Sequence, residues 1–326
     1  MRQKSLRLAM IQSQAYGGPE APRMLDDGLG HVAEAARMKA DIAVFPETSP
    51  GPVSWKHRYE VIEPMRQAAK RHGIDVVFGT TVKAPGGERA YHIAAVVIGR
   101  DGEIRGRYLR THPGPANPED PEGTQDPLAN YYNGLYAGGA FWDFDFVPGH
   151  ELPVFDMGWG KLGVGICSEV YVPEIARTYA TRGADICVFP AGIMIDDLGF
   201  KDAWQTQAKA RAGENVIYTA TTVNLFDGPL RKKHVTKELK PLDLATGLNR
   251  GYAMIAAPDR VHGTLDGPGI LTAELDLDYL RRKREEPEFP DGIKDLEAPP
   301  EFGSLPGTHN LHRSDSRIDY QLTRRG

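Results

Sequence analysis

One short segment occurs twice in this chain of 326 residues, and the repeat constrains the fold more than any other feature. Residues 40–46 read Ala-Asp-Ile-Ala-Val-Phe-Pro, and residues 184–190 match them in six of seven positions, with Cys187 in the place of Ala43. A short apolar run that stops at proline is typical of a buried strand. The match indicates a duplicated unit, two strand–helix–strand halves that end at equivalent sheet edges. It also gives Cys187 the place of a small, inert core residue.

Apolar periodicity extends this pattern along the chain. We expect strands at 6–12, 75–81, 90–99, 103–109 and 215–223, and helices at 26–38, 61–72, 173–182, 202–213 and 277–286. Segments 251–257 and 269–276 flank a Pro-Asp-Arg turn and are expected to pair as a hairpin. Together these segments predict one α/β domain over residues 1–285. Residues 286–326 are rich in Pro and charge and are expected to form an extended tail.

A second apolar segment, residues 161–167, predicts a buried strand that ends on Cys167, and a helix then begins around Pro173. The carboxyl end of a strand is where an α/β sheet presents groups to ligands. A helix N-terminus also favours a thiolate. From position alone, Cys167 could equally be a small core residue. Glu47 lies just past the strand of the first repeat, so we expect Glu47 and Cys167 to meet at one edge.

Composition excludes several function classes. A net charge of −5 leaves no basic surface for nucleic acid or for an acidic membrane. We see no signal peptide and no membrane-spanning run, and two cysteines in so long a chain are no disulfide framework. A reducing, cytoplasmic compartment is therefore expected. The chain shows no metal-binding spacing and no nucleotide-binding loop, so no cofactor is expected.

The periodicity fails between residues 111 and 148, which are rich in Pro, Gly and Asn. A loop of this length inside a compact domain is usually functional or disordered. Its aromatic side chains favour an ordered lid or pocket wall over a solvated linker, and they are Tyr131, Tyr132, Tyr136, Phe141 and Trp142.

With these segments placed, the chain resembles the nitrilase (carbon–nitrogen hydrolase) superfamily across residues 5–282. The resemblance lies in Phe-Pro-Glu at 45–47, Gly-Val-Gly-Ile-Cys at 163–167 with Pro-Glu at 173–174, Gly-Ala-Asp at 183–185 with Phe-Pro-Ala at 189–191, the segment 204–215, and Asn224. It implies a four-layer αββα sandwich that assembles into homodimers or larger homo-oligomers. It also implies a cofactor-free Glu-Lys-Cys site that acts on small amides, ureas or nitriles.

The resemblance makes Cys167 the nucleophile and Glu47 its general base. A free thiol is only a few per cent thiolate at neutral pH and needs such a base. Glu47 can serve if burial raises its pKa toward the working pH. It would take the thiol proton, pass it to the leaving amine, and then activate water against the thioester.

The chain departs from the family pattern at several positions. Arg110 stands where the family has lysine, in a Tyr-x-Lys-x-His pattern that ends here on His112. Arginine keeps the positive charge but is longer and forked, so it could stabilise an oxyanion or hold an anionic group of the substrate. The second family glutamate is missing, and Asp143, beside Trp142, could replace it. The expected substrate-binding residues are Trp142, Asp143, Ser168, Glu169, Tyr136 and His112.

The leading hypothesis is a cysteine-dependent hydrolase of a non-peptide carbon–nitrogen bond, closer to an amidase than to a nitrile-hydrolysing enzyme. The altered lysine and second glutamate motivate a different hypothesis, a binding or scaffold subunit without hydrolysis. A third is an atypical hydrolase of another carbon–heteroatom bond that uses the same nucleophile.

Overall fold

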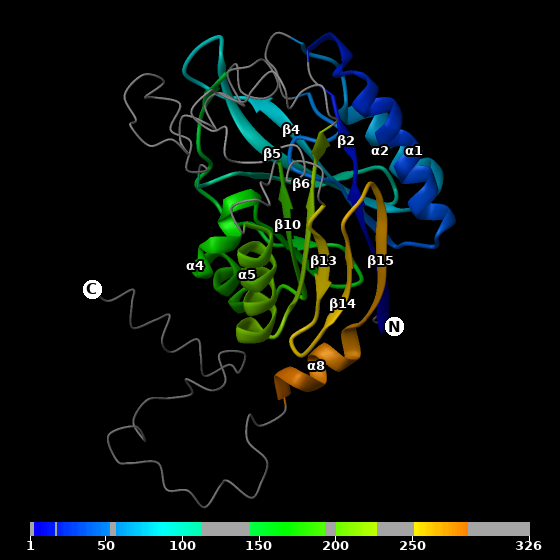
Figure 1. Cartoon of the computed structure of the whole chain (residues 1–326), viewed down its shortest axis with the longest axis vertical. Helices are drawn as coiled ribbons and strands as arrows, with labels where there is room; N and C mark the ends of the chain where they lie inside the picture. Colours follow the sequence, from blue (N-terminus) through cyan, green and yellow to red (C-terminus); the bar gives the residue numbers. More distant parts are fainter. Residues whose placement is uncertain are drawn as a thin grey trace, which may run out of the picture.

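Two β-sheets pack face to face, and helices cover the outer side of each sheet (Figure 1). The computed structural model describes residues 3–16, 18–52, 57–112, 144–192, 200–226 and 251–285. The expected tail, residues 286–326, lies outside this part of the chain. The four layers are those that the resemblance implied.

The first sheet is built mainly from the N-terminal half. Its order is β15 (Gly269–Asp276), β1 (Ser5–Gln12), β3 (Ile42–Val44), β4 (Asp75–Lys83), β5 (Ala90–Ile98) and β6 (Ile104–Leu109), and β7 (Asp145–Phe146) also pairs with β5. Strands β1, β3 and β4 run parallel. The short β3 lies between its two longer neighbours, and its C-terminal end leads directly to Glu47.

The second sheet repeats this arrangement. Its order is β14 (Val261–Leu265), β13 (Ala253–Ala256), β11 (Tyr218–Val223), β10 (Ile186–Ala191), β9 (Lys161–Val164) and β8 (Phe155–Asp156). Strands β9, β10 and β11 run parallel with β10 in the middle, as β3 is in the first sheet. The two copies of the repeated segment thus occupy equivalent places, as the sequence predicted. A small pair, β2 (Gln14–Ala15) and β12 (Leu225–Phe226), links the halves.

Helices α1 (Arg23–Arg37) and α2 (Ile62–His72) cover the first sheet, and α4 (Pro173–Thr181) and α5 (Phe200–Asn215) cover the second. On α1, buried residues recur every three or four positions and form one apolar face, made of Met24, Gly28, Val32 and Ala35. Gly73 ends α2 in the left-handed conformation at φ 63°, which glycine adopts without a steric penalty.

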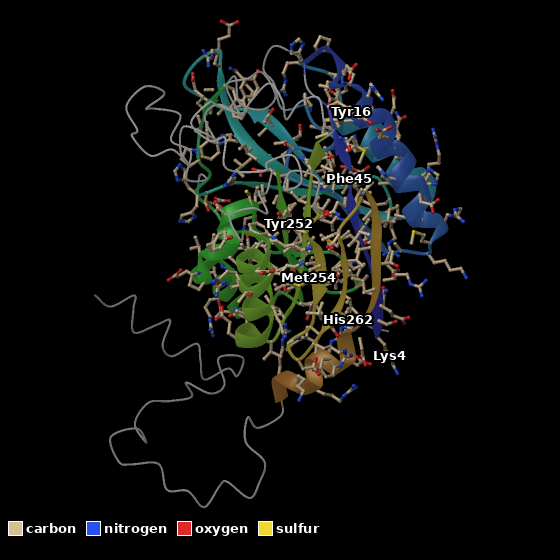
Figure 2. The ribbon with its side chains drawn as sticks, in the orientation of Figure 1. Lys4, Tyr16, Phe45, Tyr252, Met254 and His262 are labelled. Atoms are coloured by element: carbon tan, nitrogen blue, oxygen red, sulfur yellow. The ribbon has the colours of Figure 1, made fainter. Side chains whose placement is uncertain are left out.

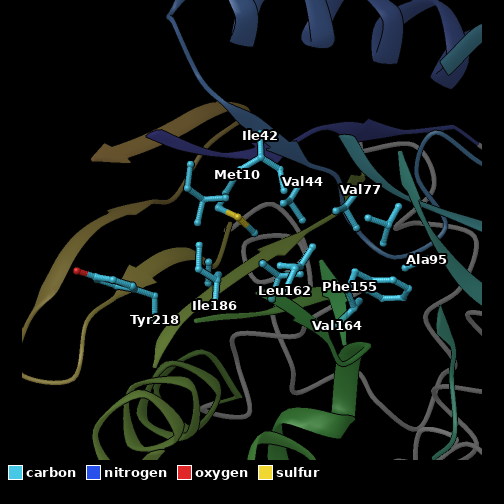
Figure 3. Packing of buried hydrophobic residues seen from close by; sticks show 14 of the residues in the cluster. Met10, Ile42, Val44, Val77, Ala95, Phe155, Leu162, Val164, Ile186 and Tyr218 are labelled. Atoms are coloured by element: carbon cyan, nitrogen blue, oxygen red, sulfur yellow. The ribbon is translucent and has the colours of Figure 1, made fainter. Parts of the chain in front are cut away.

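Strand alternation divides the buried side chains into one core between the sheets and two under the helices. Figure 3 shows the central core, where Met10 and Val44 of the first sheet face Leu162 and Ile186 of the second. Phe45 belongs to the core under α1 and α2, and Tyr252 and Met254 belong to the core under α4 and α5 (Figure 2). Cys187 lies fully buried in this last core, in the slot that the repeat predicted.

One strand pairing differs from the sequence prediction. Segments 251–257 and 269–276 do not form a hairpin with each other. Instead, β13 pairs with β14, which follows the turn directly, and β15 crosses to the other sheet, where it pairs with β1 along its whole length. Both candidate partners fit the local pattern, so only the packing of the two sheets selects the pairing.

Two buried aspartates fasten the halves at the end where the parallel strands begin. Asp75 accepts hydrogen bonds from Trp159 at 2.9 Å and from Arg100 at 3.0 Å. Asp185 accepts one from Arg284 of α8 (Leu277–Glu285) at 3.0 Å. These contacts hold the two sheets together at the end where the parallel strands begin. Glu47 and Cys167 lie at the opposite end, where the strands finish. Within the described residues, none of the helices is long and apolar enough to cross a membrane.

Candidate active site

Glu47 lies in a tight turn after β3. The turn needs a positive φ of 55° at Thr48 and is closed by a hydrogen bond from the Ser49 amide to the Pro46 carbonyl at 3.2 Å. Asn224, which follows β11, donates a hydrogen bond to the carbonyl of Glu47 at 2.7 Å. The Glu47 side chain is buried, and these two hydrogen bonds fix the backbone that positions it.

Glycine in β4 makes room for this turn. A Cβ at Gly79 would lie 2.2 Å from the Thr48 nitrogen and 2.5 Å from the Pro46 carbonyl oxygen. No side chain fits at such distances from backbone atoms. The Glu47 turn therefore sits directly against the β4 backbone.

Cys167 lies three residues beyond the end of β9, at the start of the short 3-10 helix η3 (Cys167–Tyr171). Its φ of 56° falls in the left-handed region, which costs a non-glycine residue about 1–3 kcal/mol and is typical of functional positions. The residue touches both the central core and the core under α4 and α5. Unlike the buried Cys187, it keeps some solvent exposure.

Arg110 lies one residue beyond β6, with its amide bonded to the Ile93 carbonyl at 2.9 Å. Its buried guanidinium donates hydrogen bonds from all three nitrogens. Nη1 reaches Glu47 Oε1 at 2.7 Å, Nη2 reaches Ser168 Oγ at 2.8 Å, and Nε reaches the His112 carbonyl at 2.8 Å. The Arg110 guanidinium thus bridges Glu47 and Ser168, the residue that follows Cys167 in the chain.

The pKa values of both Glu47 and Cys167 are raised, which keeps the Cys167 thiol neutral and makes Glu47 a stronger base than an exposed glutamate. Burial raises the pKa of Glu47, although the Arg110 charge and hydrogen bonds from the Cys167 thiol and the Gly192 amide oppose the rise. Burial, and next the Glu47 charge, raises the pKa of Cys167 to about 12. The Arg110 charge and the amides of Gly192 and Ser168, the latter in η3, lower the pKa of Cys167, but burial and the Glu47 charge outweigh them.

Glu169 has no solvent exposure and receives donors from two directions. Tyr108 and the Thr111 hydroxyl each donate to Oε1 at 2.7 Å, and the Thr111 and His112 amides donate to it at 2.8 and 3.0 Å. The Ile166 amide donates to Oε2 at 2.6 Å. The expected substrate contact does not fit this geometry, since the carboxylate is surrounded by protein donors. Glu169 instead ties the segment after Arg110 to the turn before Cys167.

The remaining predicted residues have different outcomes. The His112 side chain is 56% exposed, next to the chain segment of Arg110. Tyr136, Trp142 and Asp143 lie outside the described residues, and so does most of the predicted aromatic loop. Because side chains alternate along a strand, Arg107 faces the opposite side of β6 from Arg110, where it lines a depression of about 520 Å³ with Leu109 and His92.

Sequence reasoning missed Gly192. A Cβ there would lie 2.9 Å from Glu47 Oε2, and the Gly192 amide lowers the pKa of both Glu47 and Cys167. The repeat aligns Gly192 with Thr48, so the register of the two copies could have located it. In the part of the chain that is described, no group of three or more His, Cys, Asp or Glu side chains could hold a metal ion.

Known protein families and solved structures include relatives of this chain. Residues 7–285 match the sequence profile of the carbon–nitrogen hydrolases. The chain belongs to the carbon–nitrogen hydrolase family. An omega-amidase of Xenopus laevis is 26% identical over 271 residues, which are 78% of this chain and 83% of the amidase. A nitrilase of Pyrococcus abyssi is 29% identical over 272 residues, with the same coverage of 78% and 83%.

Among solved structures, an amidase from Nesterenkonia sp. superposes on this carbon–nitrogen hydrolase with a TM-score of 0.62. The two chains are 22% identical, and the match covers 87% of this chain and 95% of the amidase. This likeness supports the αββα sandwich. A variant of the amidase from Nesterenkonia sp. AN1 shows Michael addition of acrylamide at its active site cysteine.

Proposed function

We propose that this carbon–nitrogen hydrolase cleaves the amide bond of a small molecule through a covalent thioester on Cys167. One observation carries the proposal: a single buried carboxylate, Glu47, accepts a hydrogen bond from the Arg110 guanidinium and lies close enough to Cys167 for its charge to raise the pKa of the thiol. The similarity to an omega-amidase and to an amidase with a modifiable cysteine supports the choice of an amide.

In the first half of the reaction, Glu47 takes the thiol proton as sulfur attacks the amide carbon. The raised pKa of Glu47 makes it a stronger base at neutral pH than an exposed glutamate. A thiol whose pKa is about 12 leaves little resting thiolate, so proton transfer accompanies attack. Glu47 then gives the proton to the leaving nitrogen, the carbon–nitrogen bond breaks, and the thioester remains on Cys167.

Arg110 offsets negative charge throughout this step. At rest, its guanidinium faces the Glu47 carboxylate. When Glu47 becomes protonated, the negative charge moves to the former carbonyl oxygen, and the same guanidinium, already beside Glu47, can offset it there. Donors that need no reorientation are the ones that accelerate such reactions most. We assign Arg110 the part that lysine plays in the family pattern.

In the second half, Glu47 removes a proton from water, which attacks the thioester and releases a carboxylic acid. The thiol returns by taking the proton that Glu47 received. His112, exposed beside Arg110, is proposed as a substrate contact, and Glu169 as a positioning group. We also propose that the enzyme works as a homodimer or a larger homo-oligomer, which light scattering at micromolar concentration tests.

The test combines intact-mass measurement with release of ammonia. The enzyme is exposed to a panel of small amides and nitriles, and acid-quenched samples are examined for an acyl adduct. We expect at least one amide to give an adduct on Cys167 and to release ammonia, and Cys167→Ala to do neither. Adducts or turnover with nitriles alone would contradict the choice of an amide, and no adduct at all would favour the scaffold hypothesis.

A further inference from the structure

Ser168 accepts a hydrogen bond from Nη2 of Arg110, a nitrogen that a lysine at this position would not have. The guanidinium spreads its donors over a planar fork: Nη1 bonds Glu47 and Nη2 bonds the Ser168 hydroxyl at 2.8 Å. A lysine ammonium carries its three donors on a single nitrogen and is a shorter point charge. An arginine at position 110 therefore has a second buried end that needs its own acceptor, because an unmatched buried donor costs free energy.

Hydrogen bonds to the neighbouring residue Glu169 fix the position of the acceptor, the Ser168 hydroxyl. The Glu169 carboxylate binds the Thr111 and His112 amides on one side and the Ile166 amide on the other. The backbone of Glu169 also closes the turn, since its amide donates to the Ile166 carbonyl at 3.2 Å. Ser168 is thus held between the nucleophile and a carboxylate that anchors the Arg110 segment. These hydrogen bonds set the position of Ser168 relative to Arg110.

We propose that Ser168 is a positioning residue that adapts the site to arginine: its hydroxyl holds the outer guanidinium nitrogen so that the inner one stays against Glu47. The proposal rests on the proposed function only for turnover, because the contact also sets how strongly Arg110 supports the Glu47 carboxylate. Without the hydroxyl, the guanidinium loses one of its fixed ends and its grip on Glu47 weakens. The pKa of Glu47 then rises, since the Arg110 charge opposes that rise.

The test is a cycle of four proteins: wild type, Ser168→Ala, Arg110→Lys, and the double variant. The first readout is the rate at which iodoacetamide alkylates Cys167 as a function of pH, which needs no substrate. We expect Ser168→Ala to move the acid limb of this profile to higher pH when residue 110 is arginine. When residue 110 is lysine, the same substitution should leave the limb in place.

The second readout is kcat on any amide that the enzyme turns over. Ser168→Ala should lower kcat by about 10- to 100-fold in the arginine background, as loss of a hydrogen bond to a charged group does. In the lysine background it should have little effect. Equal effects in both backgrounds would overturn the proposal. If no amide is turned over, the proposed function fails, while the alkylation profile still decides the role of Ser168.

Two control comparisons separate positioning from folding. Ser168→Thr keeps a hydroxyl and should retain the wild-type acid limb. Ser168→Val has the shape of threonine but no hydroxyl, so it should move the acid limb to higher pH. Thr219→Val removes another buried hydroxyl, which donates a hydrogen bond to the Ala208 carbonyl of α5 and, within the described part of the chain, makes no hydrogen bond with Arg110. It should leave the alkylation profile unchanged. Identical profiles for Ser168→Thr and Ser168→Val would contradict a role for the hydroxyl.

Discussion

Arg110 and Glu47 form an ion pair inside the protein, with 2.7 Å between Nη1 and Oε1 and side chains only 2% and 5% exposed. Removing one partner of such a pair leaves an uncompensated buried charge, at a cost of about 3–5 kcal/mol. In the proposed mechanism, Glu47 accepts the proton and Arg110 stabilises the developing charge. Replacing either Arg110 or Glu47 should therefore change the properties of the other residue.

Replacement of Arg110 by methionine should lower kcat by about 10²–10³-fold, as loss of one oxyanion donor does. Cys167 should still be alkylated, because its sulfur and base remain. Arg110→Lys should recover part of the rate, since the charge returns but the fork does not. Steady-state kinetics check this: a raised KM with unchanged kcat would instead identify Arg110 as a substrate anchor.

Replacement of Glu47 by glutamine preserves shape but removes proton acceptance, so the rate should fall by about 10²–10⁴-fold. In the wild type, kcat/KM should decline as pH falls through the raised pKa of Glu47, because only the carboxylate can take the thiol proton. This acid limb should lie above the ordinary glutamate range and should vanish in Glu47→Gln. Wild-type turnover in that variant would point to another base.

Cys167 should react with iodoacetamide before Cys187, with loss of activity that parallels the modification. Cys187 is fully buried among apolar side chains, and burial raises the pKa of its thiol well above the usual value. Peptide mapping after partial alkylation measures the order of labelling. Cys187→Ala serves as the control and should keep most of the activity, whereas labelling of Cys187 first, with activity lost, would reverse the assignment.

Substitution of Gly79 by alanine should damage the site through the backbone. The new Cβ meets the Pro46–Thr48 turn at 2.2 Å, so the turn that aims Glu47 must move, and overpacking of this kind costs about 1–3 kcal/mol. Activity should fall further than thermal stability alone predicts. The matched control is Gly30→Ala on α1, where nothing lies within 4 Å and alanine favours the helix. Equal activity in the two variants would show that the turn tolerates displacement.

Much of the fold was predictable because it depends on short-range patterns. The repeat of residues 40–46 at 184–190 predicted two similar halves, and the structure places β3 and β10 in equivalent positions, each between two parallel strands. The helix expected at 61–72 is α2, and it ends where Gly73 adopts a positive φ. The pairing of β15 was not predictable, since its local pattern suits either neighbour and its partner β1 lies at the other end of the chain.

For the site, the sequence by itself determined which residue types follow the strands: Glu47 after β3, Arg110 after β6 and Cys167 after β9. Only the tertiary structure decided what surrounds them. The raised pKa of Cys167 comes from burial and from the charge of Glu47, a residue 120 positions away in the sequence. The inward orientation of Glu169 likewise depends on donors from Tyr108 to His112. Desolvation and charge act through space, so they appear only once distant segments are packed together.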